Sequence, residues 1–280
     1  MTPSHALAGV AAEPGVAKSD PLLVVDGVRK DFGGVRAVDV EHLEVQRGVI
    51  TGLIGPNGAG KTTLFNVLTG FDRATAGRWT FDGRIATGLP AHRLALRGMV
   101  RTFQLTRVLP RLTVLENMMI AAIGQRGERF IPAFLRPLWR RQEIDIEQRA
   151  DELLKWFRLA DKRNDYAGYL SGGQRKLLEV ARALMVDPTL VLLDEPMAGV
   201  NPALRPDLLV HIAELRDAGR TVLFVEHDMD VVMTISDWVV CMAEGRIIAE
   251  GPPDAVAGNR AVIDAYLGSH HDEPEFRERK

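Results

Sequence analysis

The residues whose types and spacing best suit chemistry form a glycine-rich segment, GPNGAGKT, at positions 55–62. An apolar run, VITGLIG, precedes it, and a helix-forming stretch, TTLFNVLTG, continues from it. Glycines let a backbone turn tightly and bring its N–H groups close to phosphate oxygens, and the positive end of a helix dipole strengthens that contact. Lys61 would then contact the β- and γ-phosphates of a nucleotide, and the Thr62 hydroxyl would bind Mg²⁺. A glycine-rich turn without a chemical role is the alternative, and the flanking strand and helix argue against it. The predicted phosphate-binding residues are Gly55, Pro56, Asn57, Gly58, Ala59, Gly60, Lys61, Thr62 and Thr63.

Two neighbouring acids, Asp194 and Glu195, follow an apolar run in the segment LVLLDEP. This pattern places Asp194 at the C-terminal end of a buried strand, which is the edge where open α/β sheets bind ligands. Asp194 would hold Mg²⁺, directly or through water, and Glu195 would polarise the attacking water as a general base. Pro196 favours an extended backbone at Glu195. The alternative is a strand that ends in two solvated acids, and a phosphate loop in the same chain disfavours it.

A second phosphate-facing helix start is predicted at LSGGQ, positions 170–174. Ser171 is a natural N-cap, and the glycines after it let an anion approach the helix. One γ-phosphate hardly needs two such helix starts from a single chain, so the second is expected to serve a nucleotide held by a partner subunit. The alternative is an ordinary serine-capped helix. Its buried stripe is predicted at Leu177, Leu178, Ala181 and Leu184.

An α/β framework must position these motifs, because short buried strand candidates alternate with helix candidates on both sides of a helical middle. The predicted strands are Leu22–Val25, VITGLIG, PTLVLLDEP, TVLFVEHD and a strand pair turning at Glu244–Gly245. The segment Val35–Val45 continues the first of these with mixed apolar and polar residues. From about 97 to 167 the chain is rich in Arg, Leu, Met and Glu, with helical spacing in LTVLENMMIAAIG and IDIEQRADELLKWFRL. We interpret this part as a helical subdomain inserted into the core.

Composition is that of an ordinary globular protein of 280 residues, with a net charge of −2 and one cysteine, Cys241. The charge gives no bulk case for nucleic-acid binding, and the cysteine is expected to be a buried structural thiol. The sequence has no apolar stretch of about 18 residues, the length that a membrane-spanning helix needs. Residues 1–20 are expected to form a disordered leader, and residues 269–280 a flexible tail.

Together, GPNGAGKT, LSGGQ and LVLLDEP, in the form and spacing seen here, resemble the ATP-binding cassette (ABC) family over almost all of residues 21–268. The resemblance implies a P-loop NTPase core of the α/β class, with a mainly parallel sheet, an antiparallel β subdomain and a helical subdomain at about 97–185. It implies two ATPs at a head-to-tail dimer interface, each between one subunit's phosphate loop and the other's LSGGQ. The partner-facing residues would be Ser171, Gly172, Gly173 and Gln174.

Three further positions match functional residues of the family. Phe32 matches the aromatic residue that stacks on adenine, with a core phenylalanine as the alternative. Gln104, in RTFQ, matches the glutamine that senses Mg²⁺ and the γ-phosphate and whose loop contacts the membrane partner. His227, in VEHD, matches the switch histidine, which hydrogen-bonds the γ-phosphate or orients the water. The expected catalytic residues are therefore Glu195, His227 and Gln104, and the expected Mg²⁺ ligands are Thr62, Gln104 and Asp194. Asn201 departs from the family pattern, because an aspartate is usual there.

Several details resemble the ATPase subunits of branched-chain amino acid importers: RTFQ, EHDM, AGVNP, the ending AYLG and an insertion at 126–143. The resemblance implies an ATPase that powers uptake of branched-chain or related amino acids from the cytoplasmic face of the cell membrane. Transmembrane permease subunits, a second ABC ATPase subunit and a solute-binding protein would be its partners. Importers of urea or short amides and exporters of lipopolysaccharide share parts of the pattern. A soluble ABC ATPase and a P-loop kinase are less well supported as functions of the chain. The insertion at 126–143 would either contact lipid headgroups or the permease, or pack on the helical subdomain.

Overall fold

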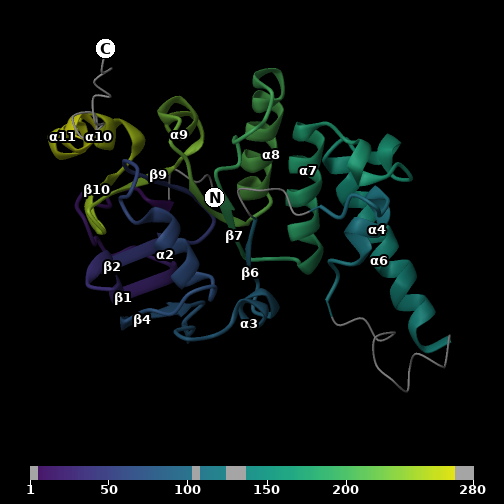
Figure 1. Ribbon diagram of the computed structural model, residues 1–280, viewed down its shortest axis with the longest axis horizontal. Coiled ribbons are helices and arrows are strands. Elements are labelled where there is room, and N and C mark those ends of the chain that lie inside the picture. Colours follow the sequence, from purple (N-terminus) through teal and green to yellow (C-terminus); the bar gives the residue numbers. More distant parts are fainter. Residues whose placement is uncertain (1–5, 103–107, 124–136, 269–280) are drawn as a thin grey trace, which may run out of the picture.

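The computed structural model describes residues 6–102, 108–123 and 137–268 and contains two sheets (Figure 1). The smaller sheet is antiparallel, in the order β2-β1-β4-β5. It is built from β1 (Pro21–Phe32), β2 (Val35–Gln46), β4 (Ala76–Phe81) and β5 (Arg84–Ile85). The larger sheet has the order β10-β9-β3-β8-β7-β6 and is parallel except for the β9–β10 hairpin. The predicted turn at Glu244–Gly245 is confirmed.

The larger sheet consists of β3 (Ile50–Ile54), β6 (Met99–Arg101), β7 (Leu190–Asp194), β8 (Thr221–Val225), β9 (Trp238–Ala243) and β10 (Arg246–Gly251). Its three central strands, β3, β8 and β7, are buried along their whole length, as expected of parallel strands covered on both faces. Successive residues of β7 point into different cores: Leu190 and Leu192 join one apolar cluster, while Val191 and Leu193 join the other. The predicted α/β class with a mainly parallel sheet is confirmed.

Helices cover both faces of the larger sheet. The apolar cluster on one face includes the antiparallel sheet and α2 (Lys61–Leu68), and the cluster on the other includes α7 (Gly172–Ala183) and α8 (Arg205–Asp217). The remaining helices are α3 (Ala91–Leu96), α4 (Val114–Met119), α6 (Pro137–Trp156), α9 (Met229–Ile235), α10 (Pro253–Ala257) and α11 (Arg260–Gly268). Figure 1 shows α4, α6 and α7 at one end of the molecule and α2 with the antiparallel sheet at the other.

The helical subdomain begins later than expected. Met99–Arg101 forms β6, which pairs in parallel with β7 and is the edge strand of the larger sheet. The apolar pair of β6 is therefore part of the core, and the boundary at about 97 was placed too early. The helices lie between 114 and 183, and α4 is only six residues long. The buried stripe of α7 is confirmed at Leu178, Ala181 and Leu184, whereas Leu177 is only partly buried.

The segment before β1 also differs from the expectation. Within the described residues, Leu7 is buried, and Lys18 forms an ion pair of 3.0 Å with Glu250 on β10 in which both side chains are inaccessible to solvent. The indole N–H of Trp238 donates to the same carboxylate at 2.9 Å, and the Lys18 backbone N–H donates to Glu44 at 2.6 Å. A buried charge is tolerable only when it is paired, and the pairing of Lys18 with Glu250 holds this stretch against β10. The prediction of a disordered leader is therefore wrong for it. Residues 1–5 and 269–280 lie outside the described residues.

Candidate nucleotide-binding and hydrolysis site

The phosphate loop joins β3 to α2, as the sequence predicts. Gly55 and Gly60 have φ values of 144° and 96°, which favour glycine, and an added Cβ would clash with the Met242 and Ala37 carbonyl oxygens respectively. At the tip of the loop, Asn57 and Gly58 are exposed to solvent, so their backbone is accessible to a ligand. The loop is thus pressed against β2 and β9 at both ends and open in the middle, which is the shape that a phosphate cradle requires.

Lys61, the first residue of α2, turns its side chain back into the loop. Its ammonium donates to the carbonyl oxygens of Gly55 at 2.6 Å and Pro56 at 2.9 Å. Burial lowers the pKa of Lys61, and the carboxylate of Glu195 opposes that shift. The Lys61 ammonium is thus held within the loop, close enough to Glu195 for their charges to interact, and its contact with phosphate stays a prediction. Thr62 is exposed and Thr63 half-buried in the first turn of α2.

Asp194 ends β7, so its predicted place at the C-terminal edge of a parallel strand is confirmed. Its carboxylate is almost fully buried and accepts a 2.6 Å hydrogen bond from Arg101 at the end of β6. The other terminal nitrogen of Arg101 donates to Asn66 at 2.7 Å and to Thr69 at 3.2 Å, both on or next to α2. Arg101 therefore joins three elements around the predicted magnesium ligand. Sequence reasoning quoted Arg101 within RTFQ and gave it no role.

Glu195 does not have the extended backbone that Pro196 was expected to favour. Its φ is 46°, in the left-handed region, so that prediction is wrong. The cause is the tight turn that follows: the Glu195 N–H donates to the Val225 carbonyl at 3.0 Å, and the Ala198 N–H donates back to the Glu195 carbonyl at 3.0 Å. Such a conformation is costly for a residue with a side chain and persists when surrounding contacts fix it. The carboxylate is half-buried beside Lys61.

His227 lies two residues beyond the end of β8 and is largely exposed. The preceding residue, Glu226, is fully buried. One Glu226 oxygen accepts the Met197 N–H at 2.8 Å, and the other accepts the His227 N–H at 3.3 Å. Burial raises the pKa of Glu226, against the effect of these hydrogen bonds. Glu226 thereby ties the loop after Glu195 to the loop that carries His227. Sequence reasoning missed it, because nothing in the segment VEHD distinguishes a buried acid from an exposed one.

The LSGGQ segment forms the N-terminus of α7, with Ser171 as its N-cap. The Ser171 hydroxyl accepts the Gln174 N–H at 3.2 Å, and the Gln174 side chain accepts the Ser171 N–H at 2.9 Å. This capping box uses the Gln174 carbonyl within its own helix. Ser171 and Gly172 are exposed, and Figure 1 shows α7 well separated from α2 of the same chain. The two predicted phosphate-facing helix starts are therefore not brought together within one chain.

The remaining predicted residues have separate outcomes. Phe32 is half exposed at the end of β1, so the alternative of a core phenylalanine is wrong; the Lys30 ammonium lies 4.5 Å from the centroid of its ring. Gln104 lies outside the described residues, as does most of the predicted insertion at 126–143. Asn201 caps a short 3₁₀ helix, Pro202–Leu204, by accepting the Ala203 N–H at 3.0 Å. An uncharged side chain suffices for that contact.

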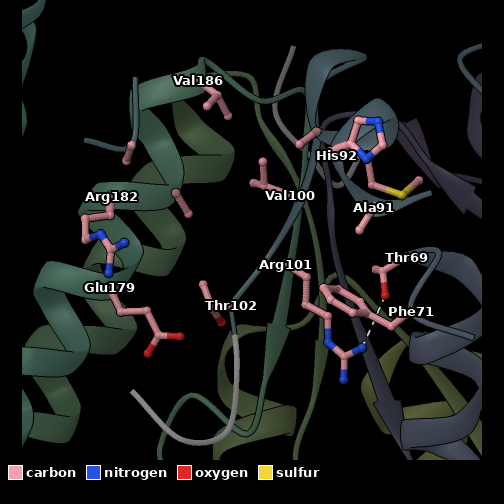
Figure 2. Close-up of a pocket in the computed structure, with 14 residues that line it drawn as sticks. Thr69, Phe71, Ala91, His92, Val100, Arg101, Thr102, Glu179, Arg182 and Val186 are labelled. Carbon is pink, nitrogen blue, oxygen red and sulfur yellow. Dashed lines mark hydrogen bonds between the residues drawn. The ribbon is translucent and has the colours of Figure 1, made fainter. Parts of the chain in front are cut away.

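A cavity of about 380 Å³ lies between the core sheet and the helical subdomain. Figure 2 shows Glu179 and Arg182 of α7 on one side, Thr69 and Phe71 on the other, and Arg101 of β6 between them. Arg101 thus lines this cavity as well as bonding Asp194. The cavity is next to Thr102, after which the chain continues into the segment that contains Gln104.

These features define a P-loop NTPase: a β-strand, glycine loop and helix with an inward-turned lysine, next to a carboxylate at the end of a neighbouring strand. Comparisons with known proteins narrow the class. A family model described as "ABC transporter" matches residues 38–198, and one described as "Branched-chain amino acid ATP-binding cassette transporter" matches residues 246–272.

The relatives are similar over nearly their whole length. The high-affinity branched-chain amino acid transport ATP-binding protein BraF of Pseudomonas aeruginosa is 42% identical, over 89% of this chain and 99% of that protein. The probable branched-chain amino acid transport ATP-binding protein LivG of Archaeoglobus fulgidus is 41% identical, over 91% and 98%. A solved ATP-binding cassette of an ABC transporter in its ADP conformation has a TM-score of 0.78 and 38% identity, over 89% of this chain and 100% of that one. The chain therefore belongs to the ABC transporter family, and it is a nucleotide-binding ATP hydrolase.

Proposed function

We propose that this chain powers the uptake of branched-chain or related amino acids by hydrolysing ATP at the cytoplasmic face of the cell membrane. The observation that carries the proposal is the agreement between the core and the C-terminal segment. The core has the elements of an ATP site, and residues 246–272 match a model described for branched-chain amino acid cassettes. The ending AYLG, at 265–268, lies inside that match.

Transmembrane permease subunits and a second ABC ATPase subunit are the proposed partners. No helix among the described residues is long and apolar enough to cross a membrane. The cavity lined by Arg101 and Arg182 is the proposed docking place for a permease segment, because its lining includes Thr102, which precedes Gln104 by two positions in the sequence. A solute-binding protein is proposed as a further component, since the solute contacts of an importer lie on other chains.

Lys61 and the loop amides are proposed to bind the β- and γ-phosphates of ATP, and Phe32 to stack on the adenine. The exposed Ser171, Gly172 and following residues would bind the γ-phosphate held by the partner subunit. Glu195 would take a proton from the attacking water, and His227 would donate a hydrogen bond to the γ-phosphate. Gln104 would sense Mg²⁺ and the γ-phosphate, and its loop would contact the permease.

Mg²⁺ fits the donor set. Thr62 offers a hydroxyl oxygen, and Asp194 offers the carboxylate oxygen that Arg101 does not bond. Hard oxygen ligands suit Mg²⁺, which is usually bound by one or two protein groups together with phosphate oxygens and waters. No group of three or more His, Cys, Asp or Glu side chains suited to a metal occurs in the described part of the chain, so phosphate and water would complete the shell. When bound, the ion would neutralise charge on the β- and γ-phosphates.

The proposal is tested with Glu195→Gln in the assembled transporter. Because the amide keeps the shape of the side chain and loses its basicity, ATP should still bind while hydrolysis falls by about 100-fold or more. Turnover at the wild-type rate would remove Glu195 from its role as the base.

Uptake of radiolabelled leucine into proteoliposomes, compared with urea and with acetamide, tests the substrate class. Transport of urea or acetamide in preference to leucine, or extraction of lipopolysaccharide, would favour the alternative subgroups.

A further inference from the structure

The first residue of the phosphate loop is bonded to the last helix of the described chain. The Gly55 N–H donates a 2.8 Å hydrogen bond to the hydroxyl oxygen of Tyr266 in α11, which is 211 residues further along the chain. The carbonyl of the same glycine accepts the Lys61 ammonium at 2.6 Å. Both polar groups of the Gly55 backbone are therefore engaged, one by the C-terminal helix and one by the lysine that is expected to contact phosphate.

Gly55 has little freedom to move toward any other partner. Its φ of 144° places the position where a Cβ would be against the Met242 carbonyl. The preceding residue, Ile54, is held in the parallel ladder opposite Cys241. If the Tyr266 hydroxyl were removed, the Gly55 N–H would lose this partner within a packed region, and a buried amide without a partner is unfavourable. The tyrosine therefore fixes where the loop begins.

Tyrosine is a suitable acceptor beside a triphosphate. Its ring packs against the apolar cluster that includes Ile54 and Cys241, and burial raises the pKa of Tyr266 to about 12. The hydroxyl is consequently neutral at physiological pH. It can accept the Gly55 N–H without placing a negative charge near the phosphates, as an aspartate or glutamate at the same position would do.

We propose that Tyr266 is a positioning residue that holds the phosphate loop in its ATP-binding shape, so that α11 sets the nucleotide affinity of the cassette. The inference rests on the phosphate-binding role proposed for residues 55–62. It also gives a physical role to part of the C-terminal segment that distinguishes the branched-chain subgroup, because Tyr266 lies within the matched residues 246–272. A loop that is already in shape does not have to be ordered by the ligand, and this preorganisation favours binding.

The test is Tyr266→Phe in the full chain, with Tyr166→Phe as the matched control. Tyr166 is half exposed, and its ring contacts Tyr169. Phenylalanine keeps the partly buried ring of Tyr266 against the apolar cluster and removes only the hydroxyl. We expect the Kd for ATP, measured by equilibrium titration, to rise about fivefold or more in Tyr266→Phe. The kcat of the assembled transporter at saturating ATP should stay within about twofold of wild type, because the Gly55 N–H that the hydroxyl accepts belongs to the proposed phosphate-binding loop and not to the residues proposed for proton transfer.

Amide hydrogen exchange tests whether the hydroxyl of Tyr266, and not only the packing of its ring, holds the start of the loop. Exchange of the peptide containing Gly55 should accelerate in Tyr266→Phe and not in Tyr166→Phe. Unchanged ATP affinity, unchanged exchange around Gly55, or the same changes in the control would each overturn the inference. Lys61→Ala separates this failure from failure of the loop assignment: if Lys61→Ala weakens ATP binding and Tyr266→Phe does not, only the role of Tyr266 is wrong. If neither variant changes the affinity, the phosphate-binding role of the loop is itself wrong.

Discussion

Three acidic side chains lie at the ends of two adjacent parallel strands, β7 and β8, and each has a different environment. Asp194 is buried and bonded to Arg101 at 2.6 Å. Glu195 is half-buried in a left-handed turn beside Lys61. Glu226 is fully buried and accepts two backbone N–H groups. The sequence marks all three as acids, but only their surroundings separate the proposed metal ligand and the proposed base from a structural acceptor.

Residue-level prediction worked where backbone geometry itself selects the residue type. Gly55 and Gly60 occupy positions where a Cβ would clash, and Ser171 is the N-cap of α7, as predicted. Prediction failed at Glu195, because the local rule for a residue before proline was overridden by a bond to Val225 on the neighbouring strand. It missed Glu226 and Tyr266, whose partners are 29 and 211 residues away in sequence.

The raised pKa of Glu226 predicts a specific pH dependence of stability. Burial raises the folded-state pKa above its ordinary value of 4.5, so the folded protein binds this proton more tightly than the unfolded chain. The stability from this effect is fully present below pH 4.5 and is lost as pH rises through the folded-state pKa. Glutamine cannot ionise, so the stability of wild type relative to Glu226→Gln should fall as pH rises above 4.5 and through the folded-state pKa. Chemical denaturation across that range measures it.

Glu116 is a control of opposite sign. Hydrogen bonds from the Thr113 backbone and hydroxyl lower its pKa below the ordinary 4.5. Its stabilising effect is present above pH 4.5 and is lost as pH falls through the folded-state pKa, so wild type should gain relative to Glu116→Gln as pH rises through this window. Parallel pH profiles for the two variants would contradict the assigned environments.

At the scale of elements, the strand and helix order was predictable and the long-range attachments were not. Continuous apolar runs identify β3, β7 and β8, and the β9–β10 hairpin carries its turn signal at Glu244–Gly245. The stretch before β1 reads as a leader because its residues have no local apolar pattern. The structure attaches it through Lys18, whose partner Glu250 lies 232 residues away. Attachments to distant groups such as Glu250 and Glu44 leave no trace in local composition.

Arg101 is the element-scale attachment around the site, because it links β6 to β7 and α2. Its guanidinium and the Asp194 carboxylate are both almost fully buried. Removing one partner of a buried pair leaves an uncompensated charge, so Arg101→Ala should lower the free energy of unfolding by about 3–5 kcal/mol. The pair of exposed Arg29 and partly buried Asp39 supplies the control, and Arg29→Ala should cost less than about 1 kcal/mol. Urea denaturation measures both; equal effects would show that Arg101 does not hold these elements together.

At the scale of the whole molecule, the decisive feature is the separation of the two helix starts that are predicted to face phosphate. α2 and α7 lie apart in one chain, and Ser171 and Gly172 are exposed at the start of α7 (Figure 1). Backbone N–H groups at a helix start favour an anion. A phosphate bound in the same chain's phosphate loop is not expected to reach the start of α7. A head-to-tail pair of cassettes would place a second chain's γ-phosphate against this end of α7. Alternating closure and opening of that pair would then drive the permease.

The most direct test of this composite site compares binding and hydrolysis in Ser171→Arg. Ser171 is not part of its own chain's phosphate loop, so the isolated chain should bind ATP with unchanged affinity. In the assembled transporter, the arginine side chain would obstruct the partner's γ-phosphate, and hydrolysis should fall by about tenfold or more. Loss of ATP affinity in the isolated chain would place Ser171 in its own site. Full hydrolysis in the assembled transporter would show that α7 faces no nucleotide, and either result would contradict the account.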